Sequence, residues 1–256
     1  VTTPEGVRIH CYEKGAGPAI LFVPGWTMPA EVWGHQIAFF SRNYRVVAMD
    51  PRSQGHSSQP SDGHYPAARA RDIKAVVDQL KLTPVTLVGW SMAVTELVSY
   101  VDQFGNTTVS RLVLVEGIVG GDFDAAATPA TLKYASAFQK DRQKATSEFV
   151  RSMFRKPQSE EYLSRLIADS LQTPTDAAMA LFLGAFTTDN RPALVKINRP
   201  ALIIAAGDNP LAAVYREMQQ RIPGARLEII ENAGHAVFVD YPARFNVLLD
   251  TFLKQR

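Results

Sequence analysis

The sequence has little that would tie it to an extracellular, membrane or nucleic-acid setting. Cys11 is the single cysteine among 256 residues, which excludes an internal disulfide and favours the cytoplasm, where thiols stay reduced. No apolar run approaches the roughly 18 residues of a membrane span, so we expect no membrane partner. The formal net charge is only +2, which predicts no nucleic-acid partner. The oligomeric state stays open.

What is present is an ordinary globular composition. Hydrophobic residues make up 46% of the chain and charged residues 20%, so the chain can bury a sizeable core. Short strand-like runs alternate with helical stretches, which predicts an α/β fold with a doubly wound, mostly parallel sheet. The expected strands are 7–13, 19–23, 45–49, 85–88, 112–115, 201–205 and 227–230, the first two paired as a hairpin.

The alternation stops in the middle of the chain. Between about residues 120 and 198 only helical stretches occur, at 129–140, 145–154, 160–172 and 175–187. We therefore expect a core domain of residues 1–119 and 199–256, interrupted by a helical insertion of residues 120–198. Most of the large apolar residues of the insertion should pack its helices, and a few should line a pocket: Phe123, Phe138, Phe149, Met153, Phe154, Met179, Phe182 and Phe186.

The sharpest local signal lies between the strand 85–88 and the helix that follows it. Ser91 sits there within Gly-x-Ser-x-Ala, a near match to the Gly-x-Ser-x-Gly nucleophile elbow. Small residues at Gly89 and Ala93 allow the strand and the helix to approach closely. The backbone N–H of Met92, at the helix N-terminus, would point where an oxyanion develops. The alternative is a plain strand–helix junction whose serine caps the helix.

The carboxyl ends of the parallel strands carry the residues that a Ser–His–acid enzyme needs. Ligands bind at this edge of an open parallel sheet. His235 follows the last strand through Asn-Ala-Gly, and we expect it to be the base for Ser91. The other four histidines are interpreted as surface or structural, and they show no metal-ligand spacing, so neither a metal nor a cofactor is expected. They are His10, His35, His56 and His64.

With these residues assembled, the chain resembles the α/β-hydrolase fold family over nearly its whole length. The loop 50–57 is similar to the family's Asp-x-Arg-Gly-x-Gly-x-Ser, with Ser53 where glycine is usual. Pro24-Gly25-Trp26 matches the His-Gly-x oxyanion turn, with Pro24 in place of histidine. The resemblance implies an oxyanion hole made by the N–H groups of Trp26 and Met92, and a cap domain where the helical insertion lies.

The acid of the triad has two candidate positions. Most family members carry it after the strand that follows the cap, where this chain has Asp208 and then Asn209. An amide cannot stabilise an imidazolium as a carboxylate does, so only Asp208 could act there, after a one-residue slip. Some members, including haloalkane dehalogenases and zearalenone lactonases, place the acid at the end of the preceding strand, which here is Glu116. We prefer Glu116 and keep Asp208 as the alternative.

The resemblance implies a serine hydrolase that cleaves a small-molecule carboxylic ester or lactone through an acyl-enzyme. No Arg or Lys cluster at a strand end indicates an anionic acyl group, so we expect an apolar or aromatic substrate. Its contacts are expected from Trp26, Met28, Trp90, Phe123 and Val237. A dehalogenase is disfavoured, because that chemistry needs aspartate at the elbow. The alternatives are a cofactor-free dioxygenase or a perhydrolase on the same fold, or a ligand-binding receptor without catalysis.

Overall fold

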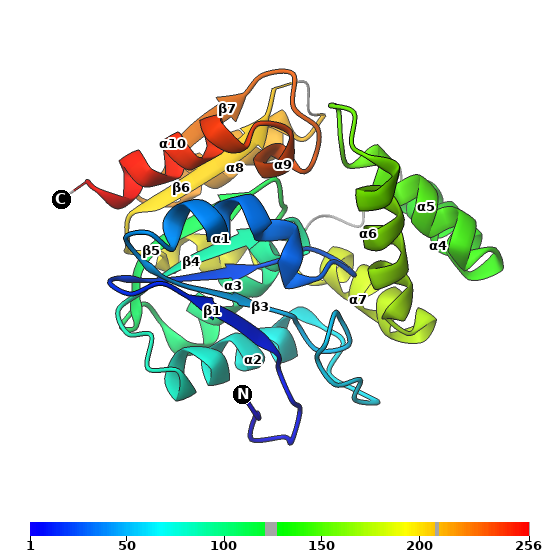
Figure 1. Cartoon of the computed structure of the whole chain (residues 1–256), viewed down its shortest axis with the longest axis horizontal. Helices are drawn as coiled ribbons and strands as arrows, with labels where there is room; N and C mark the ends of the chain where they lie inside the picture. The colour runs from blue at the N-terminus through cyan, green and yellow to red at the C-terminus, as the bar shows by residue number, and fades with distance from the viewer. Residues whose placement is uncertain (121–126, 208–209, 256) are drawn as a thin grey trace.

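A central sheet organises the molecule. The computed structural model describes residues 1–120, 127–207 and 210–255, and within them seven strands form one sheet in the order β1-β3-β2-β4-β5-β6-β7 (Figure 1). The strands are β1 (Cys11–Lys14), β2 (Ala19–Val23), β3 (Arg45–Met49), β4 (Val85–Trp90), β5 (Val109–Val115), β6 (Ala201–Ala206) and β7 (Arg226–Ile230). Only β1 runs antiparallel to its neighbour. The predicted α/β fold with a mostly parallel sheet is confirmed.

The first strand departs from the expected hairpin. β1 pairs antiparallel with β3, with Cys11 opposite Met49, and it does not pair with β2. β2 has parallel neighbours on both sides, β3 and β4, so it offers no free edge to the preceding strand. The hairpin prediction was therefore wrong, because a short turn in the sequence says nothing about which edge a later strand will occupy. The structured strand is also shorter than the predicted run 7–13.

Helices cover both faces of the sheet, and each face has its own hydrophobic core. One face packs against η1 (Ala30–Trp33), α1 (Gly34–Phe40), α9 (Val237–Asp240) and α10 (Pro242–Leu253). The other packs against α2 (Pro66–Gln79), α3 (Met92–Phe104) and α8 (Ala212–Arg221). Strands β2, β4 and β6 are buried along their whole length, which explains their continuous apolar sequences.

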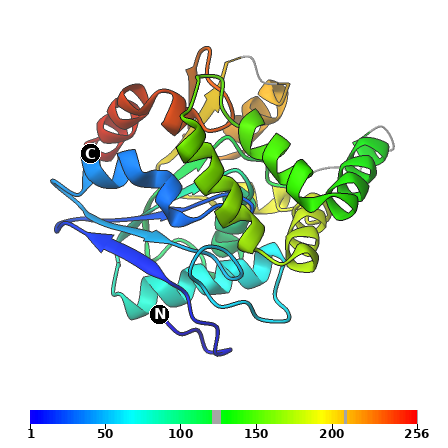
Figure 2. The ribbon, with the colours of Figure 1, turned by 45° about the vertical axis from the view of Figure 1, so that its right-hand side comes forward.

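The long connection from β5 to β6 is helical, as its sequence indicated. It contains α4 (Ala127–Lys140), α5 (Arg142–Ser152), α6 (Glu160–Gln172), α7 (Thr175–Thr187) and η2 (Arg191–Lys196). Local capping starts two of these helices, since Asp141 accepts a bond from the N–H of Lys144 and Ser159 one from Tyr162. In both ribbon views α4–α7 lie together beside the sheet (Figure 2). The division into a core domain of residues 1–119 and 199–256 and a cap of residues 120–198 stays a prediction.

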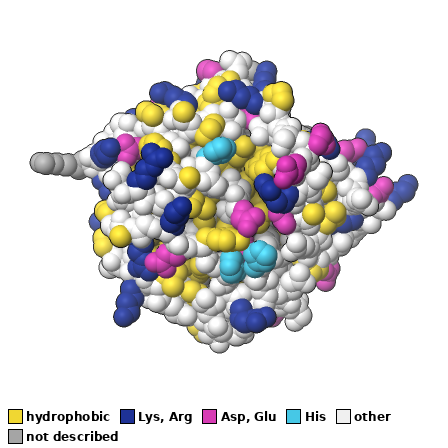
Figure 3. Space-filling view, viewed as in Figure 1, with side chains coloured by type: hydrophobic (Ala, Val, Ile, Leu, Met, Phe, Trp, Pro, Cys, Tyr) yellow, Lys and Arg dark blue, Asp and Glu magenta, His cyan; other side chains and the backbone are white. Residues whose placement is uncertain are grey.

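The face of the molecule drawn in Figure 3 shows no field of one sign. Acidic, basic and apolar side chains are interspersed on the face drawn in Figure 3. Among the helices of the described residues, none combines the length and the apolar character that crossing a bilayer requires.

Candidate active site

Ser91 occupies a strained turn between β4 and α3. Its φ of 58° and ψ of −121° lie in a region that side-chain-bearing residues rarely adopt. The turn is held by a hydrogen bond from the Ser91 N–H to the Val115 carbonyl, 2.8 Å long. Glycine is required on two sides, because a Cβ on Gly25 would lie 2.9 Å from the Ser91 Cβ and a Cβ on Gly117 would meet the Ser91 carbonyl oxygen. The surrounding backbone is thus packed closely against Ser91, which also lines a cavity.

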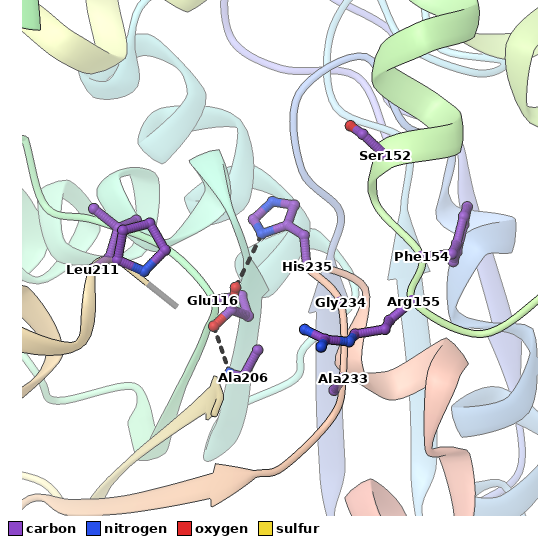
Figure 4. Close-up of a pocket in the computed structure, with 10 residues that line it drawn as sticks. Glu116, Ser152, Phe154, Arg155, Ala206, Leu211, Ala233, Gly234 and His235 are labelled. Carbon is purple, nitrogen blue, oxygen red and sulfur yellow. Dashed lines mark hydrogen bonds and ion pairs between the residues drawn. The ribbon is translucent and has the colours of Figure 1, made fainter. Parts of the chain in front are cut away.

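Three of the predicted residues meet at the carboxyl edge of the sheet. The His235 Nε2 lies 2.9 Å from the Ser91 Oγ, and the His235 Nδ1 lies 3.2 Å from the Glu116 Oε2. Glu116 follows β5 with a positive φ of 47° and is 2% exposed. The backbone N–H of Ala206 donates to its other oxygen, Oε1, at 2.7 Å (Figure 4). The carboxylate is thereby fixed in one orientation toward the imidazole.

Two hydrogen bonds fix the backbone around His235. The Trp90 indole Nε1 donates to the His235 carbonyl at 3.0 Å, and the Trp90 and His235 rings lie 5.2 Å apart. Immediately after it, the Ala236 N–H donates to the carbonyl of Met153. The imidazole is therefore placed by contacts with both the sheet and α5. Asp208, the alternative acid, lies outside the described residues.

The turn after β2 lies next to Ser91. Gly25 to Met28 form a tight turn closed by the Met28 N–H on the Gly25 carbonyl, with Thr27 at a φ of 58°. The Trp26 indole Nε1 donates to the Ala178 carbonyl of α7 at 2.8 Å, so the turn is tied to the helical insertion. Met92 is the first residue of α3, and its N–H has no acceptor within the helix. Both residues line the same cavity as Ser91.

That cavity has a volume of about 430 Å³ and is bounded by the sheet edge below and α5 and α7 above. Among the described residues that line it, the polar ones are Ser91, Glu116, His235 and Thr95. The remaining walls are apolar, and they are made by Trp26, Met92, Gly117, Ile118, Phe149, Phe182, Ala185, Phe186, Pro210 and Leu211. Phe149, Phe182 and Phe186 are the aromatic residues of the insertion that reach the cavity.

Three of the expected substrate contacts belong to the core instead. Met28, Trp90 and Val237 are at most 1% exposed and pack in the hydrophobic cluster on the α1, α9 and α10 face. They do not line the cavity. Phe123 lies outside the described residues. Each of these residues lies next to a predicted motif, but whether its side chain points up into the cavity or down into the core depends on the backbone path.

Two ionisable side chains of the helical insertion, Tyr134 and Arg142, pack against the aromatic cluster that includes Trp26. Tyr134 of α4 lies beside Trp26 and Phe182, with ring centroids 6.2 and 5.2 Å apart. Burial raises the pKa of the Tyr134 phenol to about 12, and burial lowers the pKa of the nearby Arg142 guanidinium to about 10. Among the described residues, no group of three or more His, Cys, Asp or Glu side chains is arranged to hold a metal ion.

Sequence reasoning missed the residues that close the cavity from the flanking loops. Ile118, Gly117 and Leu211 follow strand ends and Thr95 lies one turn into α3. Their positions just after the carboxyl ends of strands could have indicated them. Gln54 was also missed: its side chain, 0% exposed, donates to the backbone of the Gly25–Met28 turn.

Curated relatives show what the chain is similar to in sequence. A non-heme chloroperoxidase of Kitasatospora aureofaciens is 28% identical over 256 aligned residues, which cover 92% of this chain and 91% of the relative. A bifunctional esterase/perhydrolase of Acinetobacter calcoaceticus is 36% identical, but over 46% of this chain and 44% of its own.

Solved structures share the fold at low identity. An esterase from Exiguobacterium antarcticum superposes with a TM-score of 0.93 at 24% identity, covering 100% of this chain and 98% of that one. An enol-lactonase from Burkholderia xenovorans gives a TM-score of 0.84 at 21% identity, covering 98% of each chain. The model of the alpha/beta hydrolase family matches residues 20–247. The chain therefore belongs to the alpha/beta hydrolase family.

Proposed function

We propose that the protein is a serine hydrolase that cleaves a carboxylic ester or lactone through a covalent acyl-enzyme. The observation that carries this proposal is a pair of contacts, one between Ser91 Oγ and His235 Nε2 and one between His235 Nδ1 and Glu116 Oε2. All three residues line an apolar cavity. Glu116 is the proposed acid, since among the described residues it is the carboxylate within hydrogen-bond distance of the imidazole. Hydrolases and perhydrolases among the relatives agree with this class of chemistry.

The contacts of His235 support one direction of proton transfer. A carboxylate accepts, so the His235 Nδ1 carries the proton toward Glu116 and Nε2 is free to accept from the Ser91 hydroxyl. Ser91 Oγ attacks the acyl carbon while Nε2 takes its proton, and Nε2 then gives this proton to the departing alkoxide. Water attacks the acyl-enzyme with Nε2 again as base, and the Ser91 hydroxyl is restored as the acid product leaves.

The N–H groups of Trp26 and Met92 are proposed to bind the acyl oxygen as it becomes negative. Both are backbone groups fixed by a turn and a helix start, so they need no reorganisation during the reaction. The loss of one such donor typically lowers turnover by roughly 10²–10³-fold.

The cavity indicates a neutral acyl group. Among the described residues that line it, the ionisable side chains are only Glu116 and His235, and no Arg or Lys is there to pair with a substrate carboxylate. Aromatic walls from Trp26, Phe149 and Phe182 favour a branched aliphatic or aryl acid portion. A neutral ester such as a benzoate or butyrate should therefore exceed a hemisuccinate ester in kcat/KM by at least about tenfold.

Perhydrolysis is the second candidate, because the relatives include a protein named as an esterase/perhydrolase. Hydrogen peroxide would replace water as the nucleophile on the acyl-enzyme, giving a peroxy acid and free Ser91. The same residues serve both reactions, so only the choice of nucleophile differs.

Trapping the acyl-enzyme tests the proposal. The protein is mixed with p-nitrophenyl butyrate, quenched in acid and analysed by intact mass and peptide mapping. We expect one butyryl group on the peptide that contains Ser91, and none in Ser91→Ala. Peroxide with bromide and monochlorodimedone then measures the perhydrolase branch. Turnover that needs dissolved oxygen, or ligand binding with no acyl adduct, would contradict the proposal in favour of a dioxygenase or a receptor.

A further inference from the structure

A buried polar chain lies directly behind the oxyanion turn, and nothing in the proposed mechanism uses it. We infer that Gln54 is a positioning residue that aims the backbone N–H of Trp26 at the acyl oxygen, and that Arg69 and Glu96 hold Gln54 in the orientation it needs. The inference rests on the proposed function, since it assigns a task within the same active site.

Gln54 contacts both ends of the turn. Its Nε2 donates to the Gly25 carbonyl at 3.0 Å and to the Met28 carbonyl at 2.7 Å. Both N–H bonds of the amide are thus used on backbone carbonyls of the Gly25–Met28 turn. The side chain is 0% exposed, so no water replaces these bonds if they are lost.

The first of these bonds, together with the bond from the Met28 N–H to the same carbonyl, holds the peptide group that carries the Trp26 N–H. The Gly25 carbonyl and the Trp26 N–H belong to one peptide group, which is planar and trans, so the two bonds point in opposite directions. Drawing the Gly25 oxygen down toward Gln54 therefore turns the Trp26 N–H up toward the cavity that Trp26 and Ser91 line. Rotation of this peptide would remove the donor from the site without moving any catalytic side chain.

The contact with Arg69 determines the orientation of the Gln54 side-chain amide. Its Nη1 donates to the Gln54 Oε1 at 2.9 Å, and a guanidinium has only donors, so the amide oxygen must face it and the NH₂ must face the turn. Arg69 is 1% exposed and forms an ion pair with Glu96, 3.1 Å from Nε to Oε1, which is also 1% exposed. A pair buried this deeply adds little stability relative to apolar residues, so a positional task explains its presence better than stability does.

The test distinguishes a misdirected Trp26 N–H from a general loss of stability. It does so by changing the atom that this N–H would bind, which is the acyl oxygen of the substrate. Sulfur accepts hydrogen bonds poorly, so an enzyme with a well-aimed oxyanion hole prefers an ester to the matching thionoester, with the C=O replaced by C=S. We measure kcat and KM of the parent and of Gln54→Leu on both substrates, normalised to their hydroxide-catalysed hydrolysis. Gln54→Leu should lower kcat on the ester by roughly 10–100-fold with KM within about threefold, and should lower the ester-to-thionoester preference by about tenfold or more.

Gln36→Leu is the matched control. Gln36 is also 0% exposed, and its Nε2 donates to the Phe238 carbonyl at 3.0 Å and to the Asn246 Oδ1 at 3.1 Å, both outside the Gly25–Met28 turn. It should lose a comparable amount of stability in urea denaturation while the ester-to-thionoester preference stays that of the parent. Gln54→Glu is the second Gln54 variant, because it keeps the size and the Arg69 contact but has no N–H for the two carbonyls.

The outcomes are distinct. A folded Gln54 variant that loses stability but keeps the parent's ester-to-thionoester preference overturns the positioning role and leaves the proposed hydrolase intact. A Gln36→Leu protein with an equally reduced preference would also overturn it, because any buried glutamine would then have the same effect. A parent with no Ser91-dependent ester turnover overturns the proposed function and this inference together.

Discussion

Replacing Glu116 by glutamine is the substitution that distinguishes most sharply between the two candidate acids. The change keeps the size of the side chain and its acceptor for the Ala206 N–H. The amide NH₂ would face the His235 Nδ1, which selects the tautomer with the proton on Nε2, and that tautomer cannot accept the proton of Ser91.

The magnitude follows from the geometry. At 3.2 Å, a full charge on the imidazolium and one on the carboxylate interact by about 5 kcal/mol at an effective dielectric constant of about 20. His235 is 31% exposed, which makes this value more appropriate than that of a dry interior. At about 1.4 kcal/mol per tenfold in rate, Glu116→Gln should lower kcat by three to four orders of magnitude.

The assay is turnover of p-nitrophenyl butyrate near pH 8, with folding checked by circular dichroism and urea denaturation. Asp208→Asn is measured in parallel and should retain kcat within about tenfold of the parent. If Asp208→Asn loses activity and Glu116→Gln keeps it, the assignment of Glu116 is refuted and the acid returns to the position usual in the family.

Three further predictions concern packing and titration. Gly117→Ala adds a Cβ against the Ser91 carbonyl and the Val94 side chain, so it should lower stability by about 1–3 kcal/mol in urea denaturation and reduce kcat; unchanged values would show that the elbow can relax. Burial raises the pKa of the Cys11 thiol to about 11, so about one thiol in a thousand is ionised near pH 8 and iodoacetamide should label the native protein slowly, without loss of turnover; rapid labelling would contradict this. Burial lowers the pKa of His64, so the unfolded chain binds its proton at higher pH than the folded one, and stability should be complete above about pH 6.5 and decline as the pH falls further. His64→Gln should flatten this part of the profile of urea midpoint against pH, and an unaltered slope would assign the decline to other groups.

The sequence predicted most of the fold because its signals there are local. The strand, the small residues and the helix around Ser91 are contiguous, and the register of a parallel sheet brings the strand ends together whatever the details of the loops. Ser53 is instructive, since it stands where the family has glycine and does adopt a φ of 64°.

The parts that the sequence could not supply depend on contacts between distant segments. β1 pairs with β3 because β3 and β4 occupy both edges of β2. Whether a residue lines the pocket depends on the direction of its side chain, since Met28 points into the core and Phe149 into the cavity. Gln54 carries no local signal, because its task depends on carbonyls nearly thirty residues earlier in the chain.

The central claim is that Ser91 is the nucleophile of an ester hydrolase, and Ser91→Ala tests it most directly. Ser152→Ala is the matched control, because Ser152 lines the neighbouring pocket that His235 also lines, and its hydroxyl donates to the Phe149 carbonyl (Figure 4). With p-nitrophenyl butyrate, we predict that Ser91→Ala lowers kcat by at least about a thousandfold while Ser152→Ala stays within about threefold of the parent. Full turnover by a folded Ser91→Ala protein would contradict the account.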